Sequence, residues 1–415
     1  MIFAQNYAPE PSGNAPYVTS LAEGLQASGE FDVTVVTAHP YYPDWKIRAG
    51  YGQWKRHETL RGVRLRRKLH YVPRRPTALR RLVSELSFGA RSALSSWGRP
   101  DVVVLVSPSM FASAVTMLRL KLLHPRTPVL TWVQDLYSLG VRETGGRAGA
   151  ANVVTAVESW LFRSASSVTV IHERFRQTVT SLLGVDPDNV EVIRNWTHIS
   201  PVDGSRRAAA RSTLGWGDDE LIALHTGNMG VKQGLENVVR AAALAEQRGV
   251  GVRFVFIGGG NQRERLVAMA DGLQQVDFID SLSDEEYALA LVAADVLLVN
   301  ELPGVAGMAV PSKLTSYFAA GRPVIAATDA GGVTEEEVTA SGAGVCVPAA
   351  DESALLNAVI EVGSDPQRAS LMGLEGVRYY ERLLSPGSAF EAFRHALHSA
   401  RRSDSGNRRS RPSHH

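Results

Sequence analysis

A chain of 415 residues exceeds the usual size of one hydrophobic core, so two domains are expected. With 44% hydrophobic residues, 21% charged residues and a formal net charge of +2, the composition is typical of a soluble globular protein and excludes a disordered chain. The single cysteine, Cys346, excludes a disulfide framework and a zinc site with the usual cysteine spacing, which fits a reducing cytoplasm.

No segment of the sequence is typical of a membrane span or a signal peptide. The N-terminus has neither a basic region nor a long apolar run. The longest apolar run, from Val102 to Leu118, is interrupted by Ser107-Pro108-Ser109 and indicates a buried strand, a turn and a helix. We therefore expect a cytoplasmic protein.

Short runs rich in Val, Ile and Leu alternate with helical segments through both halves of the chain, which predicts an α/β fold with parallel sheets. The runs are continuous, as expected for strands covered on both faces. The first set is predicted at Ile2–Gln5, Val33–Thr37, Val102–Ser107, Val129–Val133, Ser167–Ile171 and Val190–Ile193. The second set is predicted at Leu221–Thr226, Arg253–Ile257, Val276–Phe278, Val296–Asn300, Pro323–Ala326 and Gly344–Val347.

A polar stretch, Ser200–Ser212, separates the two sets and predicts a boundary between a first domain, residues 1–200, and a second domain, residues 201–380. A helix over residues 381–402 is expected to pack back on the first domain. The tail, residues 403–415, is expected to be disordered because it is rich in Ser and Arg and lacks apolar periodicity. Two doubly wound domains in series would bind their ligand in the cleft between them.

The segment from Pro311 to Ala326 predicts a short helix followed by a strand. Pro311 suits the first helical position, and Gly321 with Pro323 ends the helix. Ser312 and Lys313 would then lie in the first turn, where the helix dipole disfavours a lysine unless an anion is bound. The segment therefore indicates a phosphate site, and an ordinary surface lysine is the alternative.

Three glycine-containing loops each follow a predicted strand and precede a predicted helix: Gly13-Asn14, Gly227 to Gly230, and Gly258 to Gly260. Such loops let a backbone approach a nucleotide diphosphate closely, although glycine also occurs in βα turns for packing. None is a P-loop or a complete dinucleotide fingerprint. Lys232 follows the second loop and could join Lys313 on a diphosphate, or be an ordinary helix-face lysine.

Polar residues that follow predicted strands are candidates for acid–base or acceptor contacts. Asp135 stands just past a buried strand, where it could orient or deprotonate an acceptor hydroxyl, or cap a turn. His39 and His172 follow strands in the same way, although a lone histidine is more often structural. Asp186-Pro187-Asp188 is interpreted as a turn, and no metal site is predicted.

A basic stretch from Lys46 to Arg81 contains thirteen Lys and Arg residues and one acidic residue, Glu58, with tryptophan and tyrosine between them. Basic and aromatic residues together favour an anionic membrane surface or a phosphorylated lipid. A solvated loop is the second interpretation. Nucleic acid is the last, because no nucleic-acid-binding motif accompanies the charges.

Taken in order, these landmarks resemble the retaining glycosyltransferases of family 4, which have the GT-B fold of two Rossmann-like domains. The resemblance covers nearly the whole chain and is closest to the bacterial branch that makes colanic acid and O-antigen units, including the N-acetylfucosaminyltransferases. The residues that carry it are Tyr7 to Tyr17, His39 to Trp45, Gln134-Asp135-Leu136, Arg194-Asn195-Trp196, Gly227 to Gly230, Gln233 to Glu236, Pro311-Ser312-Lys313 and Ala319 to Val324.

The resemblance implies a nucleotide-sugar donor, with a UDP-sugar favoured, held mainly by the second domain, and a lipid-linked saccharide acceptor held by the first. It implies transfer with retained configuration and without a metal or other cofactor, on the inner face of the cell membrane. The positions that match the donor site are Gly13, Asn14, Gly227, Asn228, Gly230, Gln233, Gly258, Ile279, Pro311, Ser312 and Ser316. The catalytic candidates are Lys313, Lys232 and Asp135, and the acceptor candidates are His39, Tyr42 and Trp45.

The chain departs from the wider family where two glutamates are usual, because Met308 and Ser316 stand at the matching positions. An apolar residue at position 308 suggests a donor with fewer hydroxyls, such as a deoxy- or acetamido-sugar. The missing glutamates also leave open a non-catalytic paralogue that binds nucleotide sugars. A nucleotide-sugar epimerase of the same fold is a further alternative, although it would usually need carboxylates in the donor pocket.

Overall fold

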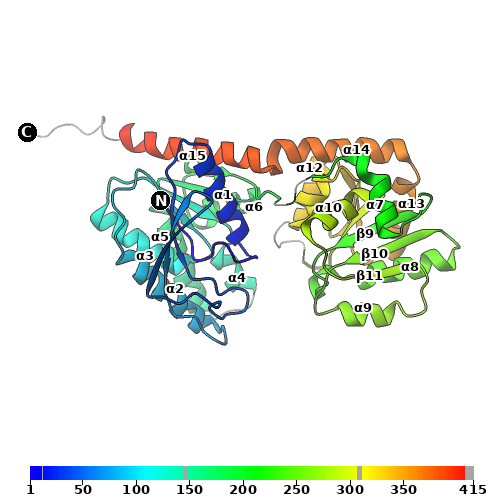
Figure 1. The fold of residues 1–415 in the computed structure, drawn as a ribbon, viewed down its shortest axis with the longest axis horizontal. Coiled ribbons are helices and arrows are strands. Elements are labelled where there is room, and N and C mark those ends of the chain that lie inside the picture. The colour runs from blue at the N-terminus through cyan, green and yellow to red at the C-terminus, as the bar shows by residue number, and fades with distance from the viewer. Residues whose placement is uncertain (12, 144–147, 198, 200, 306–310, 407–415) are drawn as a thin grey trace, which may run out of the picture. The chain divides into compact units, whose positions relative to one another are not determined.

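The computed structural model describes residues 1–406 except 12, 144–147, 198, 200 and 306–310. The described chain forms two compact units (Figure 1). Unit 1 comprises residues 1–198 together with the last helix, α15 (Pro386–Gly406), and unit 2 comprises residues 199–385. The chain therefore returns to unit 1 after completing unit 2.

Unit 1 contains a sheet of eight strands in the order β3-β4-β2-β1-β5-β6-β7-β8, in which only β3 is antiparallel to its neighbour. Its strands are β1 (Ile2–Phe3), β2 (Thr34–Ala38), β3 (Lys55–Leu60), β4 (Val63–Lys68), β5 (Val103–Val106), β6 (Val129–Val133), β7 (Ser167–Val170) and β8 (Val190–Val192). Its helices are α1 (Ala15–Ala27), α2 (Ala78–Ala93), α3 (Met110–Leu123), α4 (Tyr137–Glu143), α5 (Ala148–Arg163), α6 (Glu173–Gln177) and α15.

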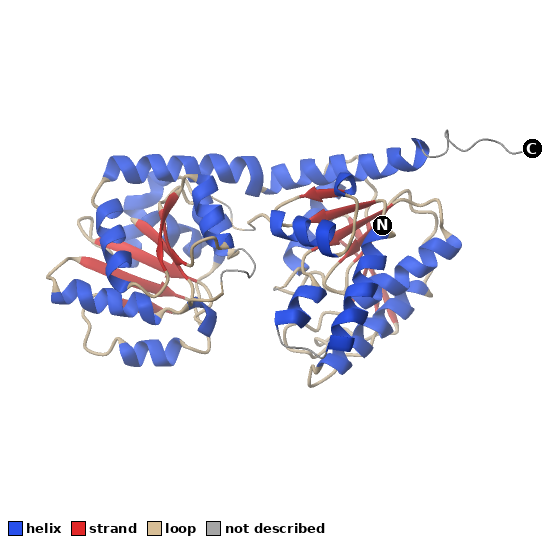
Figure 2. Cartoon of the chain, turned by 180° about the vertical axis from the view of Figure 1, so that it is seen from behind, coloured by secondary structure: helices blue, strands red, loops and turns tan. Residues whose placement is uncertain are grey.

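Both faces of the central strands are buried, which explains their continuous apolar sequence. One face packs on α1 and α15, and the other on α3 and α5 (Figure 2). Ile2 of the two-residue strand β1 pairs with Val35 on one side and with Val104 on the other, so even this short strand is central.

Helix α15 is anchored to unit 1 by aromatic side chains. The ring of Phe393 lies 4.8 Å from that of Trp132 on β6, and Trp132 stacks on Trp196 at 6.0 Å. The helix begins at Pro386, not at residue 381, because residues Tyr380–Leu384 form a π-helical turn in unit 2. It also continues to Gly406, so the segment predicted as a tail from residue 403 begins inside the helix.

Unit 2 contains a wholly parallel sheet in the order β11-β10-β9-β12-β13-β14. Its strands are β9 (Leu221–Thr226), β10 (Val252–Ile257), β11 (Val276–Ile279), β12 (Val296–Asn300), β13 (Val324–Thr328) and β14 (Gly344–Pro348). Its helices are α7 (Arg207–Leu214), α8 (Glu236–Gln247), α9 (Arg263–Met269), α10 (Asp284–Ala293), α11 (Lys313–Ala319), α12 (Val333–Ser341), α13 (Glu352–Gly363) and α14 (Pro366–Tyr379). Helices α8 and α13 cover one face, while α7, α10 and α11 cover the other.

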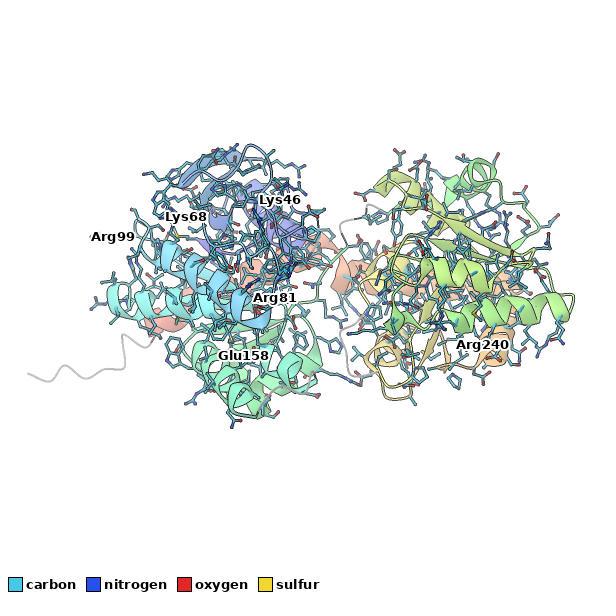
Figure 3. All side chains as sticks on the ribbon, turned by 90° about the horizontal axis from the view of Figure 1, so that it is seen from below. Lys46, Lys68, Arg81, Arg99, Glu158 and Arg240 are labelled. Atoms are coloured by element: carbon cyan, nitrogen blue, oxygen red, sulfur yellow. The ribbon has the colours of Figure 1, made fainter. Side chains whose placement is uncertain are left out.

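The basic stretch from Lys46 to Arg81 is not one loop, because it contains the hairpin β3–β4 and the start of α2. Part of the positive charge of this stretch is buried inside unit 1 and paired there with Glu58. Arg67 on β4 is 1% exposed, and its guanidinium pairs with Glu58 at 2.5 Å and donates to the carbonyl of Ala38 at 3.2 Å. Figure 3 labels three basic residues of the stretch, Lys46, Lys68 and Arg81.

Candidate active site

Strands β9 and β12 lie side by side at the centre of the unit 2 sheet, and the strand order reverses between them. In open parallel sheets, ligands bind at the carboxyl ends of the strands at such a reversal. The loop after β9 carries Gly227 to Gly230, and the segment after β12 leads to Lys313 at the start of α11. The topology thus brings the glycine loop and the lysine predicted from the sequence to the same edge of the sheet.

The glycine loops after β9 and β10 contact each other directly. The amide of Gly227 donates to the carbonyl of Ile257 at 2.8 Å, and the amide of Met229 donates to that of Gly259 at 2.7 Å. A Cβ atom at Gly258 would lie 2.3 Å from the oxygen of Gly227, and φ at Gly258 is +130°. Gly258 is therefore required for the two loops to pack together.

The turn from Gly230 to Gly234 is held from two sides. The side chain of Gln233 accepts a hydrogen bond from the amide of Gly230 at 3.1 Å. The side-chain amide of Asn300, at the end of β12, donates to the carbonyls of Gln233 and Gly234 at 2.8 and 2.9 Å. The sequence did not predict a role for Asn300, because its pattern shows only that Asn300 is the last residue of a predicted strand. The side chain of Lys232, within this turn, is exposed.

Lys313 is the first residue of α11, and Pro311 precedes the N-cap residue Ser312 instead of occupying the first helical position as predicted. The first turn closes through hydrogen bonds to the carbonyls of Pro311 and Ser312 from residues three positions on, so the α-helical pattern begins only at Lys313. Although the helix begins two residues later than predicted, Lys313 still lies in its first turn, where a bound anion would offset the unfavourable helix dipole.

The ammonium of Lys313 lies 3.3 Å from Nε2 of His225, a fully buried residue of β9. Burial lowers the pKa of Lys313 to about 7, although Glu301 opposes this effect. Burial and the neighbouring lysine hold the pKa of His225 well below its usual value. A neutral imidazole thus faces a lysine that loses its proton near neutral pH, a contact that sequence reasoning did not find.

Two other donor candidates are engaged by the protein itself. The hydroxyl of Ser316 is buried, donates to the carbonyl of Lys313 at 2.9 Å and lies 2.9 Å from the hydroxyl of Tyr287. The carbonyl of Ile279 accepts a hydrogen bond from the amide of Gly258 at 3.0 Å. Met308 lies outside the described residues.

In unit 1 the strand order reverses between β1 and β5, and the loops that follow them are linked. The side-chain amide of Asn14 donates to the carbonyl of Ser107 at 3.1 Å. Gly13, with φ of +68°, lies against Tyr42, whose ring would be 3.5 Å from an added Cβ. Candidates from the loops after β1 and β2, Gly13 and Tyr42, are therefore neighbours at the carboxyl edge of the sheet.

Glu10, which was not singled out in the sequence, organises this edge. One carboxylate oxygen accepts from the amides of Tyr41 and Tyr42, both at 2.8 Å. The other accepts from Asn6 at 3.0 Å and from the amide of Tyr7 at 3.2 Å. The buried carboxylate thereby ties the loop after β1 to the loop after β2, although burial raises its pKa.

The acceptor candidates differ in exposure. His39 is 1% exposed, and its Nε2 lies 2.8 Å from the carbonyl of Gln53, so its ring is held inside the unit. Tyr42 and Trp45 are half-buried, with ring centroids 6.2 Å apart, and the guanidinium of Arg81 lies over the Trp45 ring at 5.2 Å.

Asp135 follows β6, and its carboxylate accepts a hydrogen bond from the amide of Leu136 at 2.8 Å. The side chain of Asp135 is exposed by surface area, although desolvation by the surrounding protein raises the pKa of its carboxyl. Nearby, buried Glu85 of α2 accepts from the hydroxyl of Tyr137 at 2.5 Å and from the amide of Phe111 at 3.0 Å, and burial raises its pKa to about 7. Glu85 ties three helices together but had no signal in the sequence beyond a charged residue in an amphipathic helix.

The motif residues Gln134 and Asn195 also meet, because their side-chain amides exchange hydrogen bonds of 3.0 and 2.8 Å. His172 caps α6 by accepting from the amide of Arg174, and Asp186 caps the short turn that was predicted there. Within the described part of the chain, no group of three or more His, Cys, Asp or Glu side chains could hold a metal ion. None of the described helices is both long and apolar enough to cross a membrane.

Two family models match the chain. The first, described as a glycosyl transferase 4-like domain, matches residues 12–196, and the second, described as glycosyl transferases group 1, matches residues 220–365. The colanic acid biosynthesis glycosyl transferase named WcaI, from Escherichia coli K12, is 31% identical over 373 residues, which cover 86% of this chain and 90% of WcaI.

Solved structures share the fold over nearly the whole chain. HepE from Anabaena, solved in complex with UDP, has a TM-score of 0.70 at 14% identity and covers 96% of this chain and 99% of its own. Sucrose-phosphate synthase from Thermosynechococcus elongatus has a TM-score of 0.68 at 20% identity, with coverage of 95% and 96%. With its two matching domain models and its likeness to WcaI, the chain belongs to the family 4 glycosyltransferases and has the GT-B fold.

Proposed function

We propose that this glycosyltransferase moves a sugar, with retention of configuration, from a nucleotide-sugar donor to a lipid-linked saccharide in the synthesis of a surface polysaccharide. The observation that carries the donor assignment is the Lys313 ammonium at the carboxyl edge of the unit 2 sheet, the same edge as the Gly227 and Gly258 loops. The name of WcaI supports the polysaccharide pathway, and the UDP bound to HepE supports a UDP-sugar.

The chemistry proposed for unit 2 is stabilisation of a leaving diphosphate. Negative charge develops on that group as the glycosidic bond breaks, and a positioned ammonium with backbone N–H groups stabilises such charge strongly. Lys313 and the amides of the glycine loops would do so without a divalent metal. A diphosphate oxygen on the same face of the sugar would take the proton of the acceptor hydroxyl, so no enzyme nucleophile is needed.

The acceptor would be bound by unit 1, where the loops that Glu10 ties together place Tyr42 and Trp45 at the carboxyl edge of the sheet. Aromatic rings suit the apolar faces of sugars. Asp135 is exposed at the same edge, after β6, and is the proposed group for orienting the acceptor hydroxyl.

Replacement of Lys313 by alanine tests the central assignment. Turnover of a UDP-sugar with a membrane extract that contains lipid-linked saccharides should fall by roughly a hundredfold or more, because the leaving group loses its cation. The matched control is Lys121→Ala, which removes an exposed lysine of α3 and should leave turnover unchanged. Near-normal turnover by Lys313→Ala would refute the role, and donor binding by the wild type without any turnover would favour a non-catalytic paralogue.

A panel of donors tests the proposed sugar class. Because methionine and serine stand where the wider family carries glutamates, we expect deoxy- or acetamido-sugar nucleotides to be turned over faster than glucose or mannose nucleotides. The measurement is kcat/KM for each donor with the same acceptor preparation. Fastest turnover with plain glucose or mannose would overturn this expectation.

A further inference from the structure

A cavity of unit 2 lies beside the amino ends of the parallel strands, at the opposite end of these strands from the glycine loops. It has a volume of about 540 Å³, within the range of about 300–1,000 Å³ that is usual for pockets that bind small organic ligands. Asp295 lines it directly before β12, and Arg322 lines it two residues before β13, whereas the glycine loops follow the carboxyl ends of β9 and β10. The cavity therefore belongs to neither the donor loops nor the residues proposed for catalysis.

The cavity wall carries two arginines, Arg207 and Arg322, and two aspartates, Asp203 and Asp295. Arg207 and Arg211 both pair with Asp295, whose second oxygen also accepts the amide of Ile222 at 2.8 Å. Both oxygens of the Asp295 carboxylate therefore already have partners in Arg207, Arg211 and the backbone. The other acidic residue of the wall, Asp203, is exposed and accepts from the amide of Ser205 at 2.9 Å.

Arg322 has no carboxylate partner among the described residues. Its Nε donates to the carbonyl of Val292 at 2.9 Å, which leaves the two Nη groups without a hydrogen-bond acceptor there. Burial, together with Arg207 and Arg211 nearby, lowers the pKa of Arg322 to about 10, although Asp295 opposes this effect. The buried Nε of Arg207 also has no partner. Arg322 is half-buried in the cavity wall with both Nη groups free of acceptors in the described part of the chain, and a partly desolvated guanidinium is stabilised when an anion joins it.

We propose that this cavity binds a small phosphate-bearing anion through the guanidinium groups of Arg207 and Arg322. The planar guanidinium offers paired N–H donors that match phosphate oxygens. The remaining wall includes Val202, Ala369 and Val377, which could contact the carbon skeleton of an organic ester. Helix α11 runs from Lys313 to Ala319, so the anion site lies at the other end of the helix that begins at the proposed donor site.

Calorimetric titration of the full chain tests the site without any need for turnover, so its outcome is independent of the proposed function. The chain would carry Lys313→Ala to weaken phosphate binding at the donor loops, and the two probes are inorganic phosphate and glucose 6-phosphate. We expect saturable binding that Arg322→Gln weakens by roughly tenfold or more. Tighter binding of glucose 6-phosphate would identify an organic ester as the ligand, and equal binding would identify free phosphate.

Arg240→Gln is the matched control, because Arg240 is an exposed arginine of α8 in the same unit (Figure 3). A second variant, Ala369→Glu, would place a carboxylate in the cavity from α14. It should abolish binding and raise the melting temperature, because its carboxylate would pair with Arg322 in place of the anion. Absence of saturable binding of both probes, or unchanged binding in both Arg322→Gln and Ala369→Glu, would overturn the proposal.

Discussion

At the scale of single residues, the position of Lys313 beside a neutral histidine predicts a pH dependence of donor binding. Its pKa of about 7 means that the ammonium is charged below this pH and loses its proton above it. A bound diphosphate would favour the charged form, so binding above pH 7 must take up a proton. The affinity for UDP should therefore fall as pH rises, by up to roughly tenfold per unit between about pH 7 and 9.

Lys313→Arg provides the comparison, since an arginine stays charged over this range. The dissociation constant of UDP, measured by calorimetry across the range, should be flatter for the arginine variant than for the wild type. His225 should not contribute, because its pKa is held well below its usual value and its ring stays neutral. Parallel curves for the two proteins would show that Lys313 is not the group that titrates.

The buried carboxylates of unit 1 also act at the residue scale. Glu10 and Glu85 each bind groups from separate segments of the chain, and both have a raised pKa because of burial. Neither belongs to a motif with an assigned role, since Glu10 was noted only as part of the opening loop and Glu85 lies in a helix with many charged residues. Their function in positioning the loops follows only from the contacts that folding creates.

At the scale of elements, the two glycine loops of unit 2 predict a sharp difference between neighbouring substitutions. Gly258→Ala would drive a Cβ into the carbonyl oxygen of Gly227 at a φ of +130°. Gly259→Ala meets no atom within 4 Å and has no positive φ. The first should lower the free energy of unfolding by about 1–3 kcal/mol and weaken UDP binding, because strain and a displaced loop act together.

Urea unfolding and UDP titration of the two variants measure this difference. Gly259→Ala is the matched control and should resemble the wild type in both measurements. Equal stability and equal UDP affinity in the two variants would mean that the loops can separate without loss, and that close packing of Gly258 on Gly227 is not needed for the donor site.

Because the basic stretch from Lys46 to Arg81 contains the hairpin β3–β4, only some of its basic residues are exposed to solvent. Arg67 donates hydrogen bonds to backbone carbonyls inside unit 1, whereas four other arginines of the stretch are exposed: Arg74, Arg75, Arg80 and Arg81. Leu79 is 70% exposed beside them on α2 and Trp54 is 68% exposed before β3. The membrane-binding surface that the sequence predicts would therefore comprise the exposed arginines at the start of α2 and the exposed apolar residues beside them, and not the whole basic stretch.

At the scale of the whole molecule, this surface predicts binding to anionic vesicles. The protein should cosediment with phosphatidylglycerol vesicles and much less with neutral phosphatidylcholine vesicles. Replacing Arg75 and Arg80 by glutamine should weaken binding by roughly tenfold or more, because each basic residue near the surface contributes about 1 kcal/mol.

Arg240→Gln with Arg248→Gln removes the same charge from α8 of unit 2 and its C-cap, and should leave vesicle binding unchanged. Equal binding to both kinds of vesicle would assign the basic stretch to a solvated surface. Equal loss in both double variants would mean that net charge, and not this segment of unit 1, determines the binding.

The sequence by itself determined the strands of both parallel sheets, because buried strands need continuous apolar runs. Each of the twelve predicted strands overlaps an observed one, and the two missed, β3 and β4, form a hairpin whose charged residues hid it. The sequence also predicted that the glycine loops follow strands and that Lys313 lies in a first helical turn, because glycine in a βα turn and proline at a helix start leave local signals. Their role in donor binding stays a prediction.

Only the tertiary structure decided the partners of those residues. His225 and Asn300 read as ordinary strand residues, and Glu10 and Glu85 as ordinary charges, until folding brings distant segments within hydrogen-bond distance. The pairing of Arg207 and Arg211 with Asp295 likewise joins residues 88 and 84 positions apart. Local patterns encode the elements, whereas the charge and burial of a site depend on contacts that no local pattern contains.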